Sequence, residues 1–474
     1  MIQIDCRDAL YTYDMFHITK AFFPNEEITQ KVNESQEPLI RMELQSGSFC
    51  VACEEVKEIE LPRKKKHYVN QKLYQWLCKY TGHTMAWGIL TGIRPTKIVM
   101  GRLEAGMSED EAVHWMQETY FVSQEKANLS LEIAKREKHL LDRLDYQDGY
   151  SLYVGIPFCP SICSYCSFSS SPIGAWQNRV DLYLDALCKE ITFVSEKSKQ
   201  KKLNTIYVGG GTPTTLSAAQ LERLLTHIEK SFSYEEVLEV TVEAGRPDSI
   251  TKDKLEVLKN HHVTRISINP QTMQQKTLDV IGRKHTVEDI RMVYEQAREL
   301  GFDNINMDLI AGLPGENVSD MEDTLAQIEQ LKPDSLTIHS LAIKRAARLG
   351  QEQTEILHAD ELEKMIDLGA ESAEKMELVP YYLYRQKNSA GNFENVGYAK
   401  VDKAGIYNIL IMEEKQSIIA VGAGASTKIV LPHKIKLPNK RETNIVRIEN
   451  VKDIQEYISR IDEMIERKGE WLWH

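Results

Sequence analysis

The stretch SLYVGIPFCPSICSYC, residues 151–166, joins a short apolar run to three closely spaced cysteines. Its first six residues are typical of a buried strand, because apolar and β-branched side chains predominate in them. The cysteines are Cys159, Cys163 and Cys166, with the spacing C-x3-C-x2-C. The loop that carries them therefore begins where the predicted strand ends.

Short runs rich in β-branched residues recur as far as about residue 340, with amphipathic segments of helical length between them. They predict strands at 152–156, 205–208, 238–242, 264–268, 304–310 and 335–338. Such alternation is typical of βαβ units in a parallel sheet that is closed or partly closed into a barrel. Because the crossovers are right-handed, the carboxyl ends of all six strands should share one rim, where such barrels carry their chemistry.

Polar residues and glycines follow the predicted strands at this rim. They form GGGTPT at 209–214, EAGRP at 243–247, NPQ at 269–271, Asp308 with GLPG at 312–315, and His339. One glycine-rich turn would be weak evidence, since glycine also serves ordinary tight turns. Five such signals at strand ends predict that the loops line a single cavity.

The three cysteines allow several interpretations. A zinc site, a disulfide pair with a spare cysteine, and three buried small hydrophobes are the alternatives. Structural zinc takes four protein ligands, and no second Cys or His pair follows within reach. Electron-transfer [4Fe-4S] clusters have a thiolate on every iron, whereas three thiolates leave one iron free to bind a small molecule. We therefore favour a [4Fe-4S] cluster with one open iron.

The spacing and placement of the cysteines resemble those of the radical S-adenosylmethionine (SAM) superfamily. This resemblance implies that the amino and carboxylate groups of SAM bind the open iron. It also implies that an electron from the cluster cleaves SAM to a 5′-deoxyadenosyl radical, which removes hydrogen from a substrate. The fold that it implies is α/β, with a partial (β/α)6 TIM-like radical SAM barrel, an N-terminal α+β domain and a C-terminal α+β cap.

A longer set of motifs is similar to the oxygen-independent coproporphyrinogen III oxidase family. The motifs are YxGIPFC at 153–159, GGGTPT at 209–214, Glu243, NPQ at 269–271, IGR at 281–283 and NMDLIAGLPG at 306–315. Three further segments are similar to the longer, HemZ-like branch of coproporphyrinogen dehydrogenases. They are LTGIRPTK at 90–97, YRQKN at 384–388 and ENVGY at 394–398. The family resemblance covers about residues 151–430.

The resemblance implies a role for each matching residue. Three residues would bind the cluster: Cys159, Cys163 and Cys166. Three would line the methionine end of SAM: Gly210, Gly211 and Thr212. Four polar groups would hydrogen-bond the amino, ribose and carboxylate groups of SAM: Glu243, Gln271, Arg283 and Asp308. Tyr165 would pack over the adenine or the cluster and Tyr153 at the cluster mouth, with a core aromatic as the alternative for both.

The implied function is that of an oxygen-independent coproporphyrinogen III dehydrogenase in anaerobic haem biosynthesis. It would oxidatively decarboxylate coproporphyrinogen III to protoporphyrinogen IX, with electrons from a flavodoxin- or ferredoxin-type donor. Phe168 stands where the best-known members have a fourth cysteine, and haem-chaperone relatives also have phenylalanine there. A haem-binding trafficking protein that retains the cluster, or another porphyrin-directed radical SAM reaction, is therefore the alternative.

A tetrapyrrole with four propionates requires cationic side chains for docking. Those expected near the rim are Arg246, Lys344, Arg345, Arg348, Arg385 and Lys387. For the trafficking alternative, His339 or His285 offers a possible haem ligand. A lone histidine near a rim is more often a hydrogen-bonding core residue.

The length of 474 residues and the shifts of pattern predict three domains. They are an N-terminal α+β accessory domain at 1–148, the barrel at 149–375 and a C-terminal substrate-covering domain at 376–474. A closing helix should cover the open edge of the barrel. Its helical periodicity rests on Val451, Ile454, Ile458, Ile461 and Ile465.

The composition excludes several classes of partner. With 58 basic and 70 acidic residues the net charge is −12, so no overall field favours nucleic acid or an anionic membrane. No apolar stretch approaches a transmembrane helix, and the start MIQIDCRD has acids where a secretory signal is basic and apolar. Eight cysteines are too few for a disulfide scaffold. We expect a cytoplasmic monomer.

Overall fold

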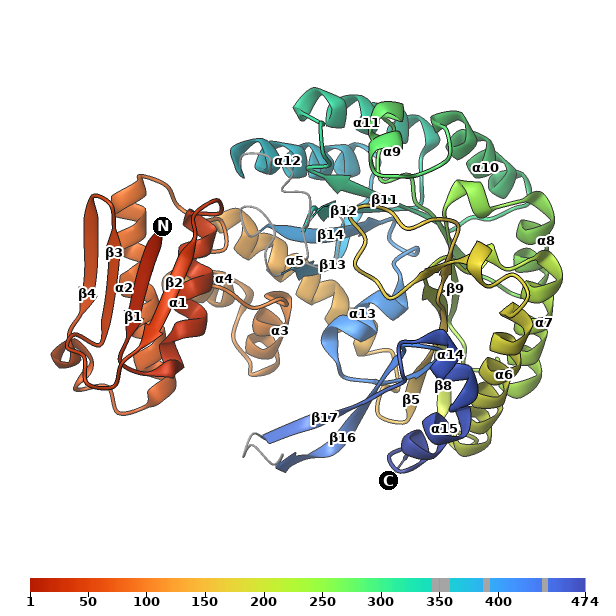
Figure 1. Ribbon diagram of the computed structural model, residues 1–474, viewed down its shortest axis with the longest axis horizontal. Coiled ribbons are helices and arrows are strands. Elements are labelled where there is room, and N and C mark those ends of the chain that lie inside the picture. Colours follow the sequence, from red (N-terminus) through yellow and green to blue (C-terminus); the bar gives the residue numbers. More distant parts are fainter. Residues whose placement is uncertain (343–348, 350–358, 387–392, 437–441, 474) are drawn as a thin grey trace. The chain divides into compact units, whose positions relative to one another are not determined.

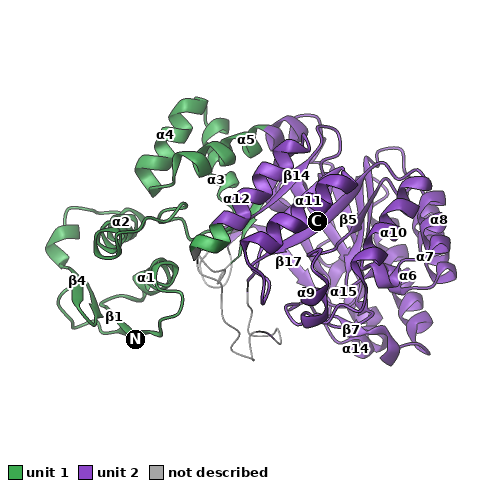
Figure 2. Ribbon diagram, turned by 90° about the horizontal axis from the view of Figure 1, so that it is seen from above, with its two compact units in different colours: residues 1–135, 357–363, 383–394 green, residues 136–356, 364–382, 395–474 purple. Residues whose placement is uncertain are grey.

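The computed structural model describes residues 1–342, 349, 359–386, 393–436 and 442–473. The chain forms two compact units (Figure 2). Unit 1 contains residues 1–135 and the described residues of 357–363 and 383–394. Unit 2 contains the described residues of 136–356, 364–382 and 395–474. The three-domain division at 148/149 and 375/376 stays a prediction.

Unit 1 contains a four-stranded sheet with two long helices packed on it. The strands are β1 (Ile2–Cys6), β2 (Ile28–Val32), β3 (Ile40–Leu44) and β4 (Gly47–Val51), in the order β2-β1-β3-β4. The helices on the sheet are α1 (Ala9–Phe22) and α2 (Pro62–Thr81), and the chain continues through α3 (Thr96–Glu104), α4 (Glu109–Tyr120) and α5 (Gln124–Leu141). Ile4, Met15 and Leu73 are fully buried in the core between sheet and helices.

The six predicted barrel strands are confirmed as neighbouring parallel strands. They are β5 (Gly149–Ile156), β8 (Lys202–Gly210), β9 (Glu239–Gly245), β10 (Arg265–Ile268), β11 (Ile305–Ala311) and β12 (Ser335–Ser340). Each strand pairs with the next one in this order. Their carboxyl ends therefore lie at one edge, and the loops of interest follow them. This is the expected partial (β/α)6 arrangement.

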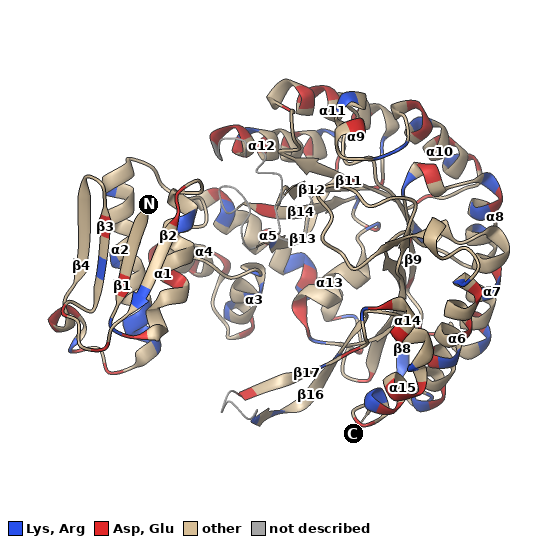
Figure 3. Ribbon diagram, in the orientation of Figure 1, with Lys and Arg blue, Asp and Glu red and all other residues tan. Residues whose placement is uncertain are grey.

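Helices form an arc along the outer side of the curved sheet (Figure 1). They are α6 (Val180–Lys197), α7 (Ala218–Ser231), α8 (Lys252–Asn260), α9 (Gln275–Val280), α10 (Val287–Glu299), α11 (Val318–Leu331) and α12 (Ala359–Lys375). Capping boxes begin α7, α10 and α11 at Ser217, Thr286 and Asn317, where each side chain accepts a hydrogen bond from a free backbone amide. Charged residues of both signs are interspersed on these helices (Figure 3).

The barrel strands alternate apolar and polar side chains, which places the two kinds on opposite faces of the sheet. Leu152, Val154 and Ile206 are fully buried, on the face that the helices cover. On the opposite, inner face, Thr205 Oγ1 donates to Ser151 Oγ at 2.8 Å. The polar residues that the sequence singled out share this inner face, because they have the same parity along their strands.

Further strands extend both edges of the six-stranded sheet. At one edge, β15 (Ser417–Val421) lies parallel to β5, and β16 (Ser426–Lys436) and β17 (Glu442–Glu449) continue antiparallel. At the other edge, β14 (Glu394–Ala399) is antiparallel to β12, and β13 (Val379–Arg385) follows it. The helix α13 (Ile406–Glu413) lies on the inner side of the arc (Figure 1).

The predicted closing helix is wrong in two respects. The chain forms two short helices, α14 (Ile454–Ser459) and α15 (Ile461–Gly469), which meet at Arg460. They pack on α6, and Lys468 of α15 also donates to Ala420 O of β15, whereas the open edge of the six-stranded sheet is extended by β15 to β17. Periodicity identifies the face of a helix that is buried, but it carries no information about the surface that buries it.

The described part of the chain contains no helix that is both long and apolar enough to cross a membrane.

Candidate functional site

The cysteine loop leaves the carboxyl end of β5 and is fastened at several points. A short parallel pair, β6 (Phe158–Cys159) and β7 (Ser171–Pro172), closes it at its base. Ser164 N donates to Ile281 O at 3.0 Å, and Ser161 Oγ donates to Gly282 O at 3.1 Å. These bonds fasten the loop to the segment after α9, so its conformation does not depend on β5 alone.

The three thiols of the loop differ in burial. Cys163 is buried, whereas Cys159 and Cys166 are partly exposed. Within the described residues, no three His, Cys, Asp or Glu side chains form a group that could hold one metal ion. In a [4Fe-4S] cluster each thiolate binds a different iron atom, so its cysteines need not converge on one point.

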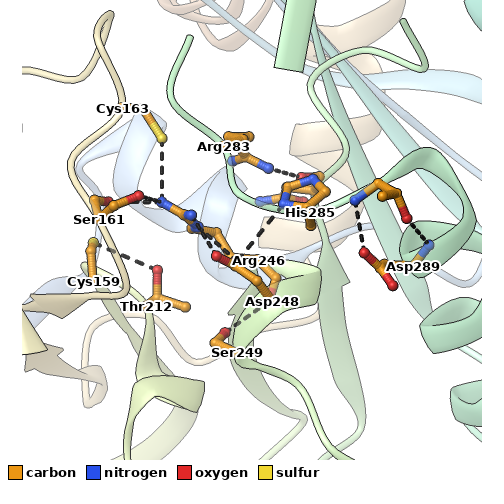
Figure 4. A network of polar contacts seen from close by, with 12 residues as sticks. Cys159, Ser161, Cys163, Thr212, Arg246, Asp248, Ser249, Arg283, His285 and Asp289 are labelled. Carbon is orange, nitrogen blue, oxygen red and sulfur yellow. Dashed lines mark hydrogen bonds and ion pairs between the residues drawn. The ribbon is translucent and has the colours of Figure 1, made fainter. Parts of the chain in front are cut away.

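Hydrogen-bond donors lie against two of the sulfur atoms (Figure 4). Thr212 Oγ1 lies 3.6 Å from Cys159 Sγ, and Arg246 Nη1 lies 3.7 Å from Cys163 Sγ. A cluster held by three thiolates is anionic at its sulfur atoms and is stabilised by such donors. The donor set and its surroundings therefore fit an iron–sulfur cluster.

The glycine-rich segment after β8 packs directly on the cysteine loop. Gly211 N donates to Ile156 O and Thr212 N donates to Phe158 O, both at 2.7 Å. A Cβ atom on Gly211 would lie 2.4 Å from Phe158 O, which no side chain tolerates. Gly210 has φ +111°, a conformation that favours glycine. The structure thus supplies a reason for these glycines that is independent of any ligand: the two loops could not approach otherwise.

A cavity of about 320 Å³ opens beside the cysteine loop. It contains three of the predicted cofactor residues, Tyr153, Gly210 and Glu243, together with Phe168. A further wall is formed by 423–425, in the turn after β15. The turn is rich in glycine, but the sequence predicts no functional role for it. The signal that could have identified it is its position directly after a strand that proves to be parallel to β5.

Glu243 lies near the carboxyl end of β9 and lines the cavity. Tyr207 OH donates to its Oε1 at 2.5 Å, and Gly210 N donates to its Oε2 at 3.3 Å. Burial raises the pKa of the Glu243 carboxyl above its ordinary value, and the hydrogen bond from Tyr207 opposes this. Glu243 therefore has a fixed orientation.

Two tyrosines beside Glu243 were not predicted as site residues. The rings of Tyr207 and Tyr407 stack with centroids 4.3 Å apart, and Tyr153 stacks on Tyr207 at 6.1 Å. Tyr407 comes from α13, whose amino end is held by Glu239 through Ile406 N at 2.7 Å. Tyr207 could have been found from its parity, which it shares with Gly209 at the end of β8.

Asp308 and Gln271 form a second group, which is not among the described residues that line the cavity. Gln271 N donates to Asp308 O at 2.9 Å, and Gln271 has φ +69°, which is uncommon for any residue but glycine. Asn306 Nδ2 donates to Asp308 Oδ1 at 2.7 Å, and His339 Nε2 lies 3.8 Å from Oδ2. Burial opposes ionisation of Asp308, but His339 and Asn306 hold its pKa below the ordinary value.

Arg283 and Tyr165 link the cysteine loop to the segment after β10. Arg283 is buried, donates through Nη1 to Asn269 O, and lies with Nη2 3.3 Å from Tyr165 OH. Tyr165 is partly exposed. The predicted residues therefore fall into three groups: the cysteine loop with Gly211, Thr212, Tyr165 and Arg283; the cavity with Tyr153, Gly210 and Glu243; and Gln271 with Asp308.

The docking role predicted for two of the rim cations is wrong. Arg246 is 3% exposed and is engaged with the cysteine loop. Arg385 is 2% exposed, donates through Nη1 to Leu90 O at 2.5 Å and lies 5.2 Å from the centre of the Trp87 ring. Burial lowers the pKa of Arg385 to about 10. Guanidinium groups held in this way have no face left for an anion from solvent.

The remaining predicted cations and the two histidines differ in where the structure places them. Lys344, Arg345, Arg348 and Lys387 lie outside the described residues. The His285 side chain is fully buried, which excludes it as a haem ligand in this structure. His339 is partly exposed beside Asp308.

Comparisons with known proteins agree with this geometry. The family described as "Radical SAM superfamily" matches residues 153–328. The chain is similar to the oxygen-independent coproporphyrinogen-III oxidase-like protein HemZ of Bacillus subtilis, at 40% identity over 422 residues, 88% of this chain and 82% of that protein. It is also similar to the heme chaperone HemW of Bacillus subtilis, at 33% identity over 277 residues, 58% of this chain and 70% of that protein.

A solved structure shares the fold. The coproporphyrinogen III oxidase (HemN) from Escherichia coli, a radical SAM enzyme, superposes with a TM-score of 0.54 at 22% identity, over 67% of this chain and 70% of that one. Proteins of this superfamily use a [4Fe-4S] cluster and SAM. The long match at 40% identity, together with the barrel and its cysteine loop, shows that the chain belongs to the radical SAM superfamily and, within it, to the HemZ-like branch of the oxygen-independent coproporphyrinogen III oxidase family.

Proposed function

We propose that the protein oxidatively decarboxylates two propionate side chains of coproporphyrinogen III, which gives protoporphyrinogen IX. The observation that carries the proposal is the cavity beside the cysteine loop, lined by Tyr153, Gly210, Glu243 and Phe168. It places polar groups and an aromatic side chain next to the proposed cluster. The similarity to HemZ over most of both chains supports the same reaction class.

The proposed cluster ligands are Cys159, Cys163 and Cys166. When bound, the cluster and SAM supply a 5′-deoxyadenosyl radical that removes a hydrogen atom from the substrate. Thr212 and Arg246 donate to the sulfur atoms of Cys159 and Cys163. These contacts would hold the two sulfur atoms in place for cluster binding.

The proposed SAM residues are those that the family resemblance implies: Tyr153, Tyr165, Gly210, Gly211, Thr212, Glu243, Gln271, Arg283 and Asp308. Glu243 presents a carboxylate that Tyr207 and Gly210 hold in place, which suits an amino or hydroxyl donor of the cofactor. Asp308 is ionised at neutral pH, because its pKa lies below the ordinary value, and it accepts hydrogen bonds only.

The size of the cavity suggests where the substrate binds. The cavity volume of about 320 Å³ lies at the lower end of the range for small-molecule pockets. We propose that this cavity binds the cofactor and that the substrate binds outside it. Phe168 is 70% exposed at the mouth of this cavity. We expect one face of the macrocycle to pack on Phe168, since an exposed phenyl ring stacks well on a flat ligand.

A second candidate is a haem-binding trafficking protein that retains the cluster. Phe168 favours it, because phenylalanine replaces the fourth cysteine there, and so does the similarity to the heme chaperone HemW. Another porphyrin-directed radical SAM reaction is the third candidate. It shares every proposed cofactor contact and differs only in its product.

Anaerobic turnover separates the candidates. The full chain, reconstituted with iron and sulfide, is incubated with coproporphyrinogen III, SAM and dithionite, and products are followed by mass spectrometry. We expect 5′-deoxyadenosine and a tetrapyrrole lighter by two CO2 and four hydrogen atoms, with a Cys163→Ser variant as the background.

The trafficking candidate predicts the opposite pattern. The same preparation would then bind haem stoichiometrically, cleave SAM slowly and leave coproporphyrinogen III unchanged. A tetrapyrrole product of any other mass would support the third candidate. Either result would overturn the decarboxylation.

A further inference from the structure

Arg246 makes an unusual set of contacts for a residue at the end of a barrel strand. It follows β9 and is 3% exposed. Its Nη1 donates to Ser161 O at 2.7 Å and to Ser161 Oγ at 3.0 Å, and lies 3.7 Å from Cys163 Sγ (Figure 4). One nitrogen atom therefore contacts the backbone of the cysteine loop and the thiol of a proposed cluster ligand.

Asp248 holds the other edge of the same guanidinium. Arg246 Nε donates to Asp248 Oδ1 at 2.9 Å and Nη2 donates to Oδ2 at 2.6 Å. Such a bidentate pair fixes the plane of the guanidinium as well as its position. The fork of arginine allows one edge to bind a carboxylate while Nη1 stays directed at the loop, which a lysine ammonium does not reproduce.

The surroundings keep both partners charged. His285 Nδ1 lies 3.8 Å from Asp248 Oδ1. Although burial raises the pKa of Asp248, His285 and Arg246 hold it well below the ordinary value. The arginine is a permanent cation. A buried positive charge thus faces Cys163, with the carboxylate of Asp248 on its far side, where that side chain is 15% exposed.

These charges would act on a cluster bound to Cys163. Reduction adds a negative charge to an iron–sulfur cluster, so hydrogen bonds to its sulfur atoms and nearby positive charge raise its reduction potential. The effect is large in a buried site, because water does not screen the charge there. Asp248 opposes the effect, but its carboxylate is separated from the sulfur atom by the guanidinium (Figure 4).

We propose that Arg246 is a positioning residue that anchors the cysteine loop at Ser161 and raises the reduction potential of the cluster through Cys163, while Asp248 limits the increase. The proposal rests on the cluster of the proposed function, but it does not depend on the identity of the substrate. It predicts shifts of opposite sign when the two charges are removed separately.

Redox titration of the reconstituted full chain tests this, with the electron paramagnetic resonance signal of the reduced cluster as readout and no SAM or substrate present. For Arg246→Gln we expect the ratio of reduced to oxidised cluster at a fixed potential to fall at least tenfold, a shift of about 59 mV for a one-electron couple. For Asp248→Asn we expect the ratio to rise. Arg246→Lys, which keeps the charge but not the fork, should lie between Arg246→Gln and the parent.

A matched control is available in unit 2. Arg298 Nη1 lies 2.6 Å from Asp334 Oδ2, and Asp334 directly precedes β12, at the amino ends of the strands and away from the cysteine loop. Arg298→Gln removes an arginine–aspartate pair of the same kind, so the potential should equal that of the parent.

The possible outcomes are distinct. Shifts of the same sign in Arg246→Gln and Asp248→Asn, or no shift in either, would overturn the proposal. If Arg246→Gln fails to load iron, the test rests on Asp248→Asn alone. The proposal is then refuted if the reduction potential of Asp248→Asn is not higher than that of the parent. Failure of the parent to form a cluster would end both the proposed function and this inference. Normal potentials with no decarboxylation would contradict the substrate alone.

Discussion

At the scale of the residue, Cys163 is distinguished from the other two cysteines of the loop by its burial and its contact with Arg246. It is the buried one of the three thiols, and the guanidinium of Arg246 faces its sulfur atom. A thiolate is a soft ligand that suits iron–sulfur clusters, whereas a serine hydroxyl at the same place stays protonated at neutral pH. If the loop binds the proposed cluster, loss of this sulfur atom should therefore remove one of its three thiolate ligands.

We predict that Cys163→Ser loses nearly all cluster iron after anaerobic reconstitution but keeps its secondary structure. The fold should survive because β5, the short β6–β7 pair and the bonds from Ser161 and Ser164 hold the loop without the thiol. Iron analysis beside circular dichroism measures both properties. Cys188→Ser, on α6 and outside the loop, is the matched control and should load iron like the parent. Full loading of Cys163→Ser would remove this cysteine from the cluster.

At the scale of the element, a buried polar network fastens α14 and α15 to α6. Glu190 on α6 accepts through Oε1 from Lys468 Nζ at 2.6 Å and through Oε2 from Tyr457 OH at 2.6 Å. Its Oε2 also accepts from Gly422 N at 2.9 Å. Since the turn that begins at Gly422 forms the cavity wall at 423–425, the terminal helices and the wall share one buried carboxylate.

We predict that Lys468→Met destabilises unit 2 by about 3–5 kcal/mol, the usual cost of removing one partner of a buried ion pair. Glu190 and Lys468 are both fully buried, so the remaining carboxylate would have no solvent to stabilise it. Denaturant unfolding followed by circular dichroism measures the change. The double variant Lys468→Met with Glu190→Gln should recover part of the loss.

The exposed pair between the same two elements is the control. Lys189 on α6 lies 2.5 Å from Asp462 on α15, with side chains 52% and 81% exposed. Lys189→Met should change stability by less than about 1 kcal/mol, because water solvates both charges. Equal effects of Lys468→Met and Lys189→Met would contradict the assigned role of the buried network.

At the scale of the whole molecule, the pH dependence of stability should include a contribution from two buried carboxyl groups. Glu137 near the end of α5 and Glu413 at the end of α13 are almost inaccessible to solvent. Burial, together with the charge of Glu413, raises the pKa of Glu137 well above its ordinary value of 4.5. A carboxyl group whose pKa is raised by folding stabilises the fold below its ordinary pKa. That contribution is lost as the pH rises through the raised value.

We predict that Glu137→Gln becomes more stable relative to the parent as the pH rises above about 5, and that the difference shrinks toward pH 4. Glutamine stays neutral at every pH, so it avoids the cost of ionising a buried group. Unfolding in denaturant between pH 4 and 8 measures the difference. Glu256→Gln, at an exposed position of α8, should follow the parent throughout. A constant difference between Glu137→Gln and the parent would show that folding does not raise the pKa of Glu137.

The sequence alone determined the barrel strands, the rim that their carboxyl ends share, and the family. These depend on local signals: the alternation of side chains along a strand, the spacing of Cys159, Cys163 and Cys166, and glycines at strand ends. Each is readable within a window of a few residues. Local signals could not identify the partners of Arg246. The sequence predicted that Arg246 docks an anionic substrate, whereas in the structure it is buried and bound to Ser161 and Asp248.

Only the tertiary structure decided which distant residues meet. Arg246 reaches a loop 85 positions away, and Lys468 reaches Glu190 across 278 positions. The cavity wall at 423–425 and the stacking of Tyr407 on Tyr207 arise in the same way, from segments that pack on the barrel late in the chain. A buried charge needs an opposite charge or a hydrogen-bond partner, but any segment of the chain can supply it, so composition and spacing predict that partners exist and only packing selects them.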